Sequence, residues 1–171
     1  MTEKLVHWFL GIFSGISALA FGREIVVFII SMLPILELRG GLIAASLLNL
    51  DPIVSYIICI IGNLLPVPFI LWFMASILNW MRKSKYLKKF ANWLDKKVEK
   101  NKDKIEKLGF WGLVLFVGIP LPGTGAWTGC LVASVLEMDK KKSFLAAIIG
   151  VFMASIIMMI VSFGLLKGII N

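Results

Sequence analysis

Long apolar runs dominate this chain, and polar residues are confined to a few short places between them. The runs cover residues 5–21, 25–50, 53–78, 108–136 and 144–170. A helix rises about 1.5 Å per residue, so a membrane span needs roughly 20 apolar residues. Most of the runs are long enough to cross a bilayer or to dip into one. We therefore predict an all-α, polytopic integral membrane protein. The short first run, residues 5–21, either spans the bilayer or lies in its interface.

Two of the runs are broken by residues that membrane helices usually avoid. The first break is Pro34-Ile-Leu-Glu37-Leu-Arg39-Gly40-Gly41, and the second is Pro120-Leu-Pro122-Gly123-Thr124-Gly125-Ala126-Trp127-Thr128-Gly129. Irregular backbone at membrane depth survives only where protein or a water-filled cavity satisfies its polar groups. The two breaks are therefore the candidate transport site.

Composition supports a membrane protein and argues against several kinds of chemistry. The chain is 59% hydrophobic and 16% charged, whereas about a quarter of the residues of soluble domains are charged. Motifs for binding nucleotides or for a hydrolase serine are absent from the sequence. His7 is the single histidine, and Cys59 and Cys130 lie within apolar runs. We expect no metal, no cofactor, no nucleic-acid partner and no enzymatic activity.

The polar segment 80–107 carries most of the net charge. It has 11 lysine and arginine residues against 4 acids, so its charge of 11 − 4 = +7 is nearly all of the formal +8. Apolar residues recur in it three or four apart, which predicts an amphipathic helix. Such a helix either lies on anionic lipid headgroups or packs on its own bundle. The apolar positions are Leu87, Phe90, Leu94, Val98, Ile105 and Leu108.

The positions of the positive charges predict the topology. Lysine and arginine near span ends favour the cytoplasm, so segment 80–107 should be cytoplasmic in a protein of the inner (plasma) membrane. The lysines at 140–142 stay on that side only if residues 108–136 enter and leave as a re-entrant hairpin. Residues 25–50 would form a matching hairpin from the outside. We predict one membrane domain of two inverted halves, residues 1–79 and 80–171. The alternative is two ordinary spans with glycine kinks.

The chain resembles the small multidrug export protein family of bacteria and archaea. The resemblance rests on Pro34-x-x-Glu37-Leu-Arg39-Gly40-Gly41 and on the run from Pro120 to Gly129, and it covers most of the chain. This family is more distantly similar to the DedA superfamily, whose members have two re-entrant hairpins. The DedA resemblance implies translocation of lipid-linked phosphates, such as a polyprenyl phosphate, or of phospholipids, often coupled to proton motive force. DedA proteins carry arginines in the second hairpin, whereas residues 118–129 of this chain contain none.

Glu37 and Arg39 are the strongest candidates for binding substrate or protons. An ionisable residue inside a span costs on the order of 2.5–3.5 kcal/mol, so it is usually functional or paired. Glu37 could exchange a proton, and the planar fork of Arg39 suits an anion. Alternatively, the two residues pair with other groups and only hold the hairpin together.

The second break offers different groups. Gly123, Thr124 and Gly125 present uncovered backbone N–H groups that suit an anion, and the hydroxyls of Thr124 and Thr128 add to them. Trp127 could form a cavity wall. Gly40, Gly41, Pro120 and Pro122 shape the two tips, and Pro34 and Asn63 are expected to support them.

Three functions fit these residues. The first is translocation of an amphipathic or lipid-linked substrate, with proton coupling. The second is export of cationic drugs, with Glu37 as the cation site. The third is a scaffold or assembly factor that transports nothing. The sequence leaves the substrate, the coupling ion and the oligomeric state open.

Overall fold

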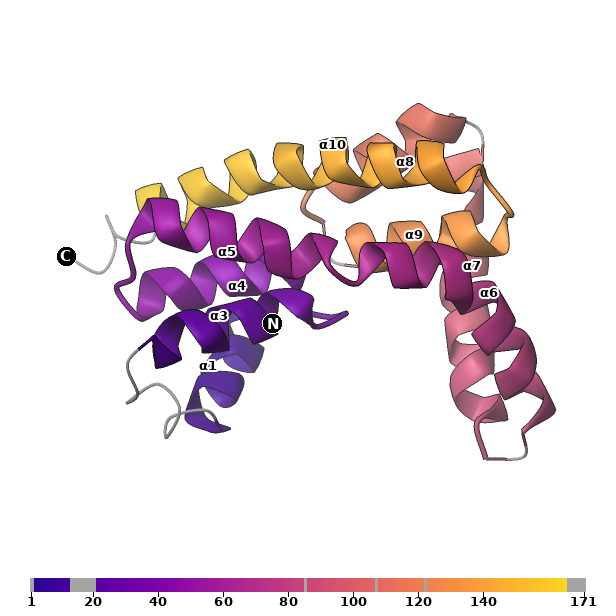
Figure 1. Ribbon diagram of the computed structural model, residues 1–171, viewed down its shortest axis with the longest axis horizontal. Helices are drawn as coiled ribbons and strands as arrows, with labels where there is room; N and C mark the ends of the chain where they lie inside the picture. Colours follow the sequence, from indigo (N-terminus) through magenta and orange to yellow (C-terminus); the bar gives the residue numbers. More distant parts are fainter. Residues whose placement is uncertain (1, 13–20, 85, 107, 122, 166–171) are drawn as a thin grey trace. The chain divides into compact units, whose positions relative to one another are not determined.

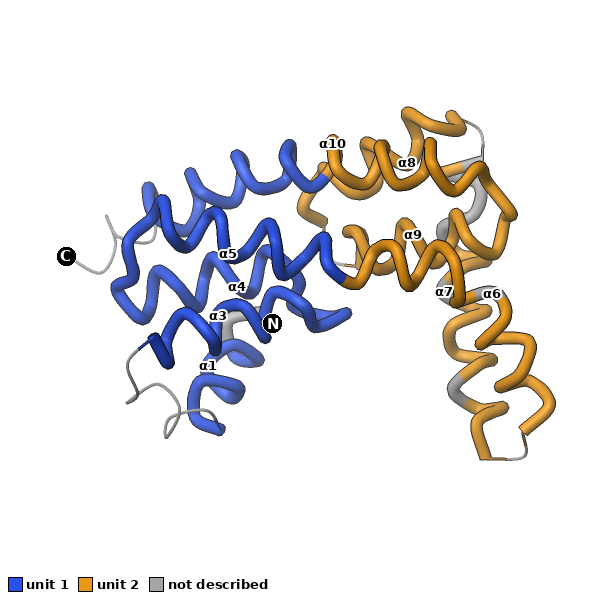
Figure 2. The backbone as a smooth tube through the Cα atoms, viewed as in Figure 1, with its two compact units in different colours: residues 1–65, 151–171 blue, residues 66–150 orange. Residues whose placement is uncertain are grey.

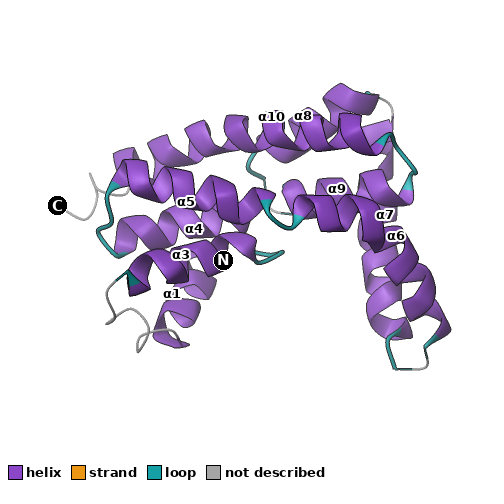
Figure 3. Ribbon diagram, viewed as in Figure 1, coloured by secondary structure: helices purple, strands orange, loops and turns teal. Residues whose placement is uncertain are grey.

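The computed structural model describes residues 2–12, 21–84, 86–106, 108–121 and 123–165. Throughout these residues the regular structure is helical, with short turns between the helices (Figures 1 and 3). This confirms the predicted all-α class. The helices are α1 (Thr2–Ile12), α3 (Gly22–Met32), α4 (Glu37–Leu47), α5 (Pro52–Leu64), α6 (Val67–Lys83), α7 (Lys88–Glu106), α8 (Gly109–Gly118), α9 (Ala126–Val135), α10 (Lys140–Met159) and the π-helical η1 (Ile160–Leu165).

The helices form two compact units (Figure 2). Unit 1 contains residues 1–65 and 151–171, and unit 2 contains residues 66–150. The chain therefore passes from unit 1 to unit 2 between Leu65 and Pro66, and it returns within α10. These boundaries differ from the division between residues 79 and 80 that the sequence predicted. That division into two inverted halves of a membrane domain stays a prediction.

Unit 1 is built on three successive helices. Helices α3, α4 and α5 all pack against one another, and α1 and η1 add to α4. Short loops join the three helices, so each runs antiparallel to the next. Asp51 begins α5, because its side-chain oxygen accepts hydrogen bonds from the backbone N–H groups of Ile53 and Val54, both at 2.9 Å. Asp51 thus caps α5, and Pro52 suits its first turn because a backbone N–H at that position would have no partner within the helix.

Unit 2 contains α6, α7, α8, α9 and the first half of α10. Helix α7 contacts α6, α8 and α9. Helix α9 also contacts α6 and α8, and α6 packs more extensively on α9 than on α7. Val98 and Ile105 of the predicted apolar stripe are buried, as is Ala91, whereas Leu108 is 58% exposed. Because α7 contacts these three helices, part of its surface packs within this unit, and the predicted contact of this segment with lipid headgroups stays a prediction.

Several predicted boundaries were wrong. The basic segment 80–107 is not one helix, because α6 continues to Lys83 and ends where Ser84 adopts an extended backbone. The last helix begins at Lys140 rather than at residue 144, because Asp139 accepts a hydrogen bond from Lys142 N (2.8 Å) and begins the helix. The run 53–78 is interrupted next to Pro66, where α5 ends at Leu64 and α6 begins at Val67. Helix α1 ends at Ile12, and the rest of the 5–21 prediction reaches into residues outside those described.

The two units contain a sequence repeat, which we recognised only from the helix bounds. Adding 88 to the residue numbers of α3, α4 and α5 gives 110–120, 125–135 and 140–152, close to α8, α9 and the start of α10. Over residues 22–64 and 110–152, 13 of 43 aligned positions are identical without any gap. The identical residues of the first copy are Val26, Phe28, Leu33, Pro34, Gly41, Ala45, Ser46, Leu48, Asp51, Ser55, Ile60, Ile61 and Gly62.

Backbone geometry follows the same 88-residue register. The helix after each break ends in a left-handed residue, Asn49 (φ 53°) in the first copy and Glu137 (φ 54°) in the second. The same carbonyls accept hydrogen bonds in each copy: Leu50 N donates to Ala45 O at 3.0 Å, and Met138 N donates to Ala133 O at 3.0 Å. An aspartate then begins the next helix in both copies. The repeat is therefore one of structure as well as of sequence.

Exposed apolar faces on the two longest helical stretches indicate a lipid environment. Residues Pro52–Met74 and Lys140–Gly164 are long and apolar enough to cross a membrane. Large apolar side chains of α5 and α10 are exposed, whereas buried positions of unit 1 include polar and charged residues. Apolar outside and polar inside is the pattern of membrane helices. The exposed residues on these helices are Ile53, Val54, Ile57, Ile61, Leu145, Ile149, Phe152, Ile156 and Ile157.

Candidate functional site

Glu37 is a buried carboxylate in a strained backbone conformation. It is the first residue of α4, directly after the turn at residues 33–36, and its side chain is only 4% exposed. Its φ of 51° lies in the left-handed region, which non-glycine residues visit at a cost of order 1–3 kcal/mol. The corresponding residue of the second copy is Gly125. Glutamate thus occupies a position whose backbone favours glycine.

Arg39 lies beside Glu37 and is half-buried. The two side chains attract each other electrostatically, as the interpretation of a paired acid and base requires. Being two residues apart on a regular helix, they would not face each other, but the left-handed backbone of Glu37 relaxes that restriction.

Gly40 and Gly41 allow close packing at the first break. A Cβ at Gly40 would lie 2.6 Å from Leu36 Cβ, within the turn itself. A Cβ at Gly41 would clash with Ser31 Oγ of α3 and would lie 2.8 Å from Cys59 Sγ of α5. Gly41 is therefore the point at which α3, α4 and α5 meet, and its role in the structure is packing.

Ser31 and Cys59 complete this meeting point. Both are fully buried. The Ser31 hydroxyl is hydrogen-bonded to the Cys59 thiol and donates to Val27 O at 2.8 Å. Neither residue was among the predicted site residues, because serine and cysteine in apolar runs are ordinary in a sequence.

Asn63 is buried one helical turn beyond Cys59. Its side chain is 3% exposed, and its Oδ1 atom has no hydrogen-bond partner. No hydrogen bond of Oδ1 therefore links Asn63 to either break, and its predicted supporting role stays a prediction. Buried amide oxygens are usually bonded, so this atom requires an explanation.

The second break is a turn that is closed by its own threonine. Leu121 N donates to Thr124 Oγ1 (3.2 Å), and this hydroxyl lies 2.8 Å from both Ile119 O and Leu121 O. Gly123 (φ 87°) and Gly125 (φ 130°) take conformations that favour glycine. The Thr124 hydroxyl thus holds the turn. Pro120 precedes the turn, and Pro122 lies outside the described residues.

The residues after this turn are mainly packed. Thr128 is buried and Trp127 is half-buried. A Cβ at Gly129 would lie 2.9 Å from Val117 Cγ2 and 3.0 Å from Leu113 Cδ1, so α9 approaches α8 closely here. Glu37 and Arg39 belong to unit 1 and the second break belongs to unit 2. The prediction that the two breaks form one site stays a prediction.

Cavities among the described residues of unit 2 include one that is mainly apolar and one that is polar. One, of about 220 Å³, is mainly apolar and lies along α8 beside the second turn; Leu108, Phe116, Leu121 and Thr124 are among its lining residues. It could hold the apolar part of a small amphipathic molecule. The lining includes neither an acid nor a base.

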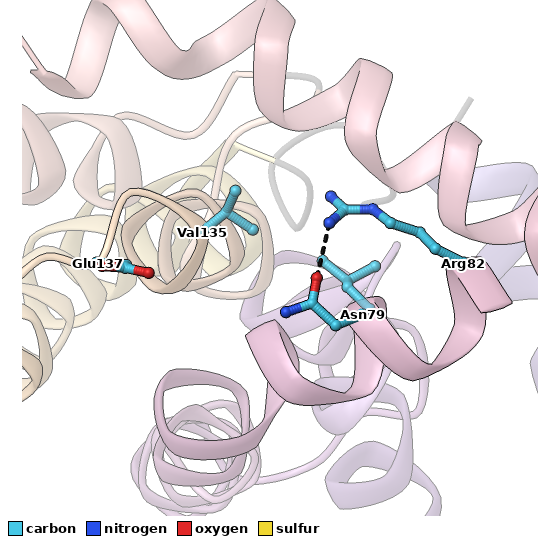
Figure 4. A pocket seen from close by; sticks show the side chains of 5 residues that line it. Asn79, Arg82, Val135 and Glu137 are labelled. Carbon is cyan, nitrogen blue, oxygen red and sulfur yellow. Dashed lines mark hydrogen bonds between the residues drawn. The ribbon is translucent and has the colours of Figure 1, made fainter.

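The other cavity, of about 180 Å³, is polar (Figure 4). Arg82 forms one wall and Glu137 the opposite one. Arg82 donates to Asn79 Oδ1 at 2.8 Å and to both carboxylate oxygens of Asp95 at 2.6 and 3.0 Å. The hydrogen bonds that Arg82 donates to the Asp95 carboxylate raise the pKa of the Arg82 guanidinium. These bonds join α6 to α7. The sequence did not indicate this cavity, because its lining comes from two separate segments, residues 78–82 and 135–137.

Over the part of the chain that the structure describes, no three histidine, cysteine, aspartate or glutamate residues lie close enough to hold a metal ion. Glu37, Asn63 and the thiol of Cys59 lie in one region of unit 1, but an amide and a thiol next to a single carboxylate do not make a preferred donor set for a common divalent ion.

Residues 37–157 match the family described as "Putative small multi-drug export protein". The chain belongs to this family. The match covers 121 of 171 residues, begins at Glu37 and includes the whole second break. Neither the curated proteins nor the solved structures contained a match. The predicted family is thereby confirmed, and its description, together with the exposed apolar helices, supports a membrane transporter. The distant relationship to DedA proteins stays a prediction.

Proposed function

We propose that this small multidrug export family member is a proton-coupled membrane exporter of small amphipathic molecules, with Glu37 as the residue that alternates between proton and substrate. The single observation that carries the proposal is the buried Glu37 carboxylate, held at the first break in a backbone conformation that favours glycine. Strained residues that the surrounding structure maintains are typical of functional sites.

The mechanism follows from the chemistry of a buried carboxylate. Burial penalises the charged form of an acid, so Glu37 requires either a proton or a cationic partner. Arg39 supplies one such partner. A cationic substrate or a proton would compete for the same carboxylate, and exchange between them would couple substrate export to proton entry.

Cationic amphipathic molecules are the substrate class that we favour. The family description names drug export, and arginine is absent from residues 118–129, where a phosphate would need a second cationic partner. Translocation of lipid-linked phosphates is the second candidate, and the observation that favours it is the half-buried guanidinium of Arg39.

Reconstituted transport tests this function. Purified protein in liposomes with an imposed pH gradient should export a lipophilic cation, and the same assay with a polyprenyl phosphate tests the second candidate. Glu37→Gln should reduce proton-driven flux to that of empty liposomes, since the amide cannot exchange a proton. The matched control is Glu99→Gln, an acid on the exposed side of α7, which should transport like the native protein. Native protein that moves neither substrate would instead support the scaffold interpretation.

We further propose that anionic lipid headgroups contact the connection between α6 and α7 rather than the apolar stripe of α7. Trp80 (64% exposed) lies in the last turn of α6, Tyr86 (90%) in the connection and Trp93 (50%) near the start of α7, and the lysines at 83, 88 and 89 are exposed as well. Aromatic and basic side chains are enriched at membrane interfaces. A spin label at Trp93→Cys should sense the headgroup region in anionic vesicles, and one at Val98→Cys, on the buried stripe, should not. A label at Trp93→Cys that senses only water would contradict this contact.

A further inference from the structure

Asn63 has a buried acceptor that nothing in the described structure uses. Its Oδ1 atom is without a hydrogen-bond partner although the side chain is 3% exposed. A buried amide oxygen without a donor destabilises the state in which it occurs. A donor that is present in only one state of the protein would explain why the atom is retained.

The packing register places Glu37 at the level of Asn63. Helices α4 and α5 are antiparallel neighbours, and Gly41 lies against Cys59 Sγ. Glu37 lies four residues before Gly41, and Asn63 lies four residues after Cys59. Residues four apart share one face of a helix. The face of α4 that holds Gly41 also holds Glu37, and the face of α5 that holds Cys59 also holds Asn63. Because the two helices are antiparallel, Glu37 and Asn63 therefore lie at one level, one turn from the contact between Gly41 and Cys59 and nearer the first break.

The second copy of the repeat replaces both members of this pair. At 88 residues further on, Gly125 stands for Glu37 and Val151 stands for Asn63. The hydrogen-bonded pair of Ser31 and Cys59 is likewise replaced by Ile119 and Ala147. In the first copy both residues of each pair are therefore polar, and in the second copy neither residue is. This is expected if the two residues of a pair act together.

We propose that Glu37 and Asn63 form one proton-binding site, in which Asn63 Oδ1 accepts a hydrogen bond from the protonated Glu37 carboxyl group. This inference rests on the proposed function and deepens it by assigning where the proton is held. The carboxylate takes up one proton from water, and its new O–H group donates to Asn63 Oδ1. Release of the proton breaks that hydrogen bond and restores the carboxylate.

The site then has two alternative partners for one acid. Arg39 attracts the charged form of Glu37, and Asn63 stabilises the neutral form by accepting from it. Asn63 is a positioning residue, because it sets the protonated state of Glu37 without exchanging a proton itself. The other charged or titratable residues on α4 and on the described helices that pack against it are Glu3, Lys4, His7, Arg23, Glu24, Tyr56 and Cys59.

Infrared difference spectroscopy of the purified native chain in detergent, recorded between high and low pH, tests the pair directly. The native protein should show a protonated carboxyl band that is lost in Glu37→Gln. In Asn63→Leu, which is close in size and lacks the acceptor, this band should move to higher frequency because the acid makes one hydrogen bond fewer. The pH at half-protonation should also fall by about one unit, a tenfold change in proton affinity. Asn63→Gln, which keeps an amide oxygen, should retain part of the native behaviour.

Ser162→Ala is the matched control. Ser162 Oγ is also a buried unpartnered atom of unit 1, and its loss should leave the Glu37 band unchanged. An unchanged band and midpoint in a folded Asn63→Leu protein would overturn the proposal, as would the absence of any Glu37 band over the stable pH range. The readout needs no substrate. A protein that transports nothing but shows the shift would therefore remove the proposed function and leave the proton site in place.

Discussion

At the residue scale, Glu37 combines two unfavourable features, burial of a charge and a left-handed backbone. Its φ is 51° and its side chain is 4% exposed. The second copy of the repeat avoids both by placing Gly125 at the same position. The first copy thus has a buried acid at a position where the second copy has the residue that a positive φ favours.

Replacement of Glu37 should separate its chemical role from its backbone cost. We expect Glu37→Gly to lose proton-driven transport and to be more stable than Glu37→Ala by about 1 kcal/mol, since glycine adopts a positive φ without strain and alanine does not. Thermal unfolding of the two variants in detergent measures the difference. At Glu24, on the regular helix α3, the same pair of substitutions should have the opposite order. Equal stability of the two Glu37 variants would show that the left-handed backbone carries no such cost.

The sequence was sufficient to identify Glu37 and Arg39, because charges inside an apolar run are conspicuous. It indicated Asn63 only as a support for the breaks, and it did not indicate Ser31. Their importance depends on which turn of α5 faces which turn of α4, and on the contact of Gly41 with α3 and α5. Such a register is a property of packed helices, and hydropathy along one chain does not contain it.

At the element scale, helices α3, α4 and α5 of unit 1 meet in a close contact at Gly41. Gly41 leaves no space for a Cβ between Ser31 and Cys59. The identical residue in the second copy, Gly129, similarly permits α9 to approach Val117 and Leu113 of α8. Close approach through small residues is a general mode of helix packing in membranes, and here the same position of the repeat provides it twice.

Gly41→Ala should destabilise unit 1 by about 1–3 kcal/mol, because the added methyl group overpacks a closed contact. Thermal unfolding in detergent measures the loss. Combining it with Ser31→Ala should recover part of the stability, since the clashing hydroxyl is removed, and a double-mutant cycle isolates that coupling. Gly11→Ala is the control, because a Cβ at Gly11 would meet no atom within 4 Å. Additive effects at Gly41 and Ser31 would contradict the contact.

Helix ends were less predictable than helix existence. The apolar runs correctly indicated α5, α6 and α10, but the last run was predicted to begin at residue 144, after the lysines at 140–142. In the structure they form the first turn of α10, since Asp139 provides the hydrogen bond that begins the helix. A capping residue outweighed the local polarity.

At the scale of the whole molecule, the two copies of the repeat share a backbone arrangement but differ in their buried polar residues. Both copies share the left-handed turn after the second helix, the capping aspartate and the close glycine contact. The buried acid occurs only in the first copy. Sequence reasoning recognised a likeness in plan between the halves. It missed the 88-residue register, which Leu33-Pro34 and Leu121-Pro122, together with Ala45-Ser46 and Ala133-Ser134, already display. The register also supplies equivalent positions for testing the topology.

Asn49 and Glu137 are the most suitable pair for that test. They correspond in the repeat, both are exposed, and both are left-handed residues after a helix, so cysteine should be tolerated equally at the two positions. If the copies insert in opposite directions, a membrane-impermeant maleimide added outside intact cells should label Asn49→Cys and leave Glu137→Cys unlabelled until the membrane is opened. The native cysteines, Cys59 and Cys130, are buried, so the unsubstituted protein is the control for background. Labelling of both variants from the same side would rule out inverted insertion and would favour two parallel copies with glycine-kinked spans. Labelling from opposite sides would place the Asp51 end of the first copy outside and the lysines at 140–142 inside, as the distribution of positive charge predicts.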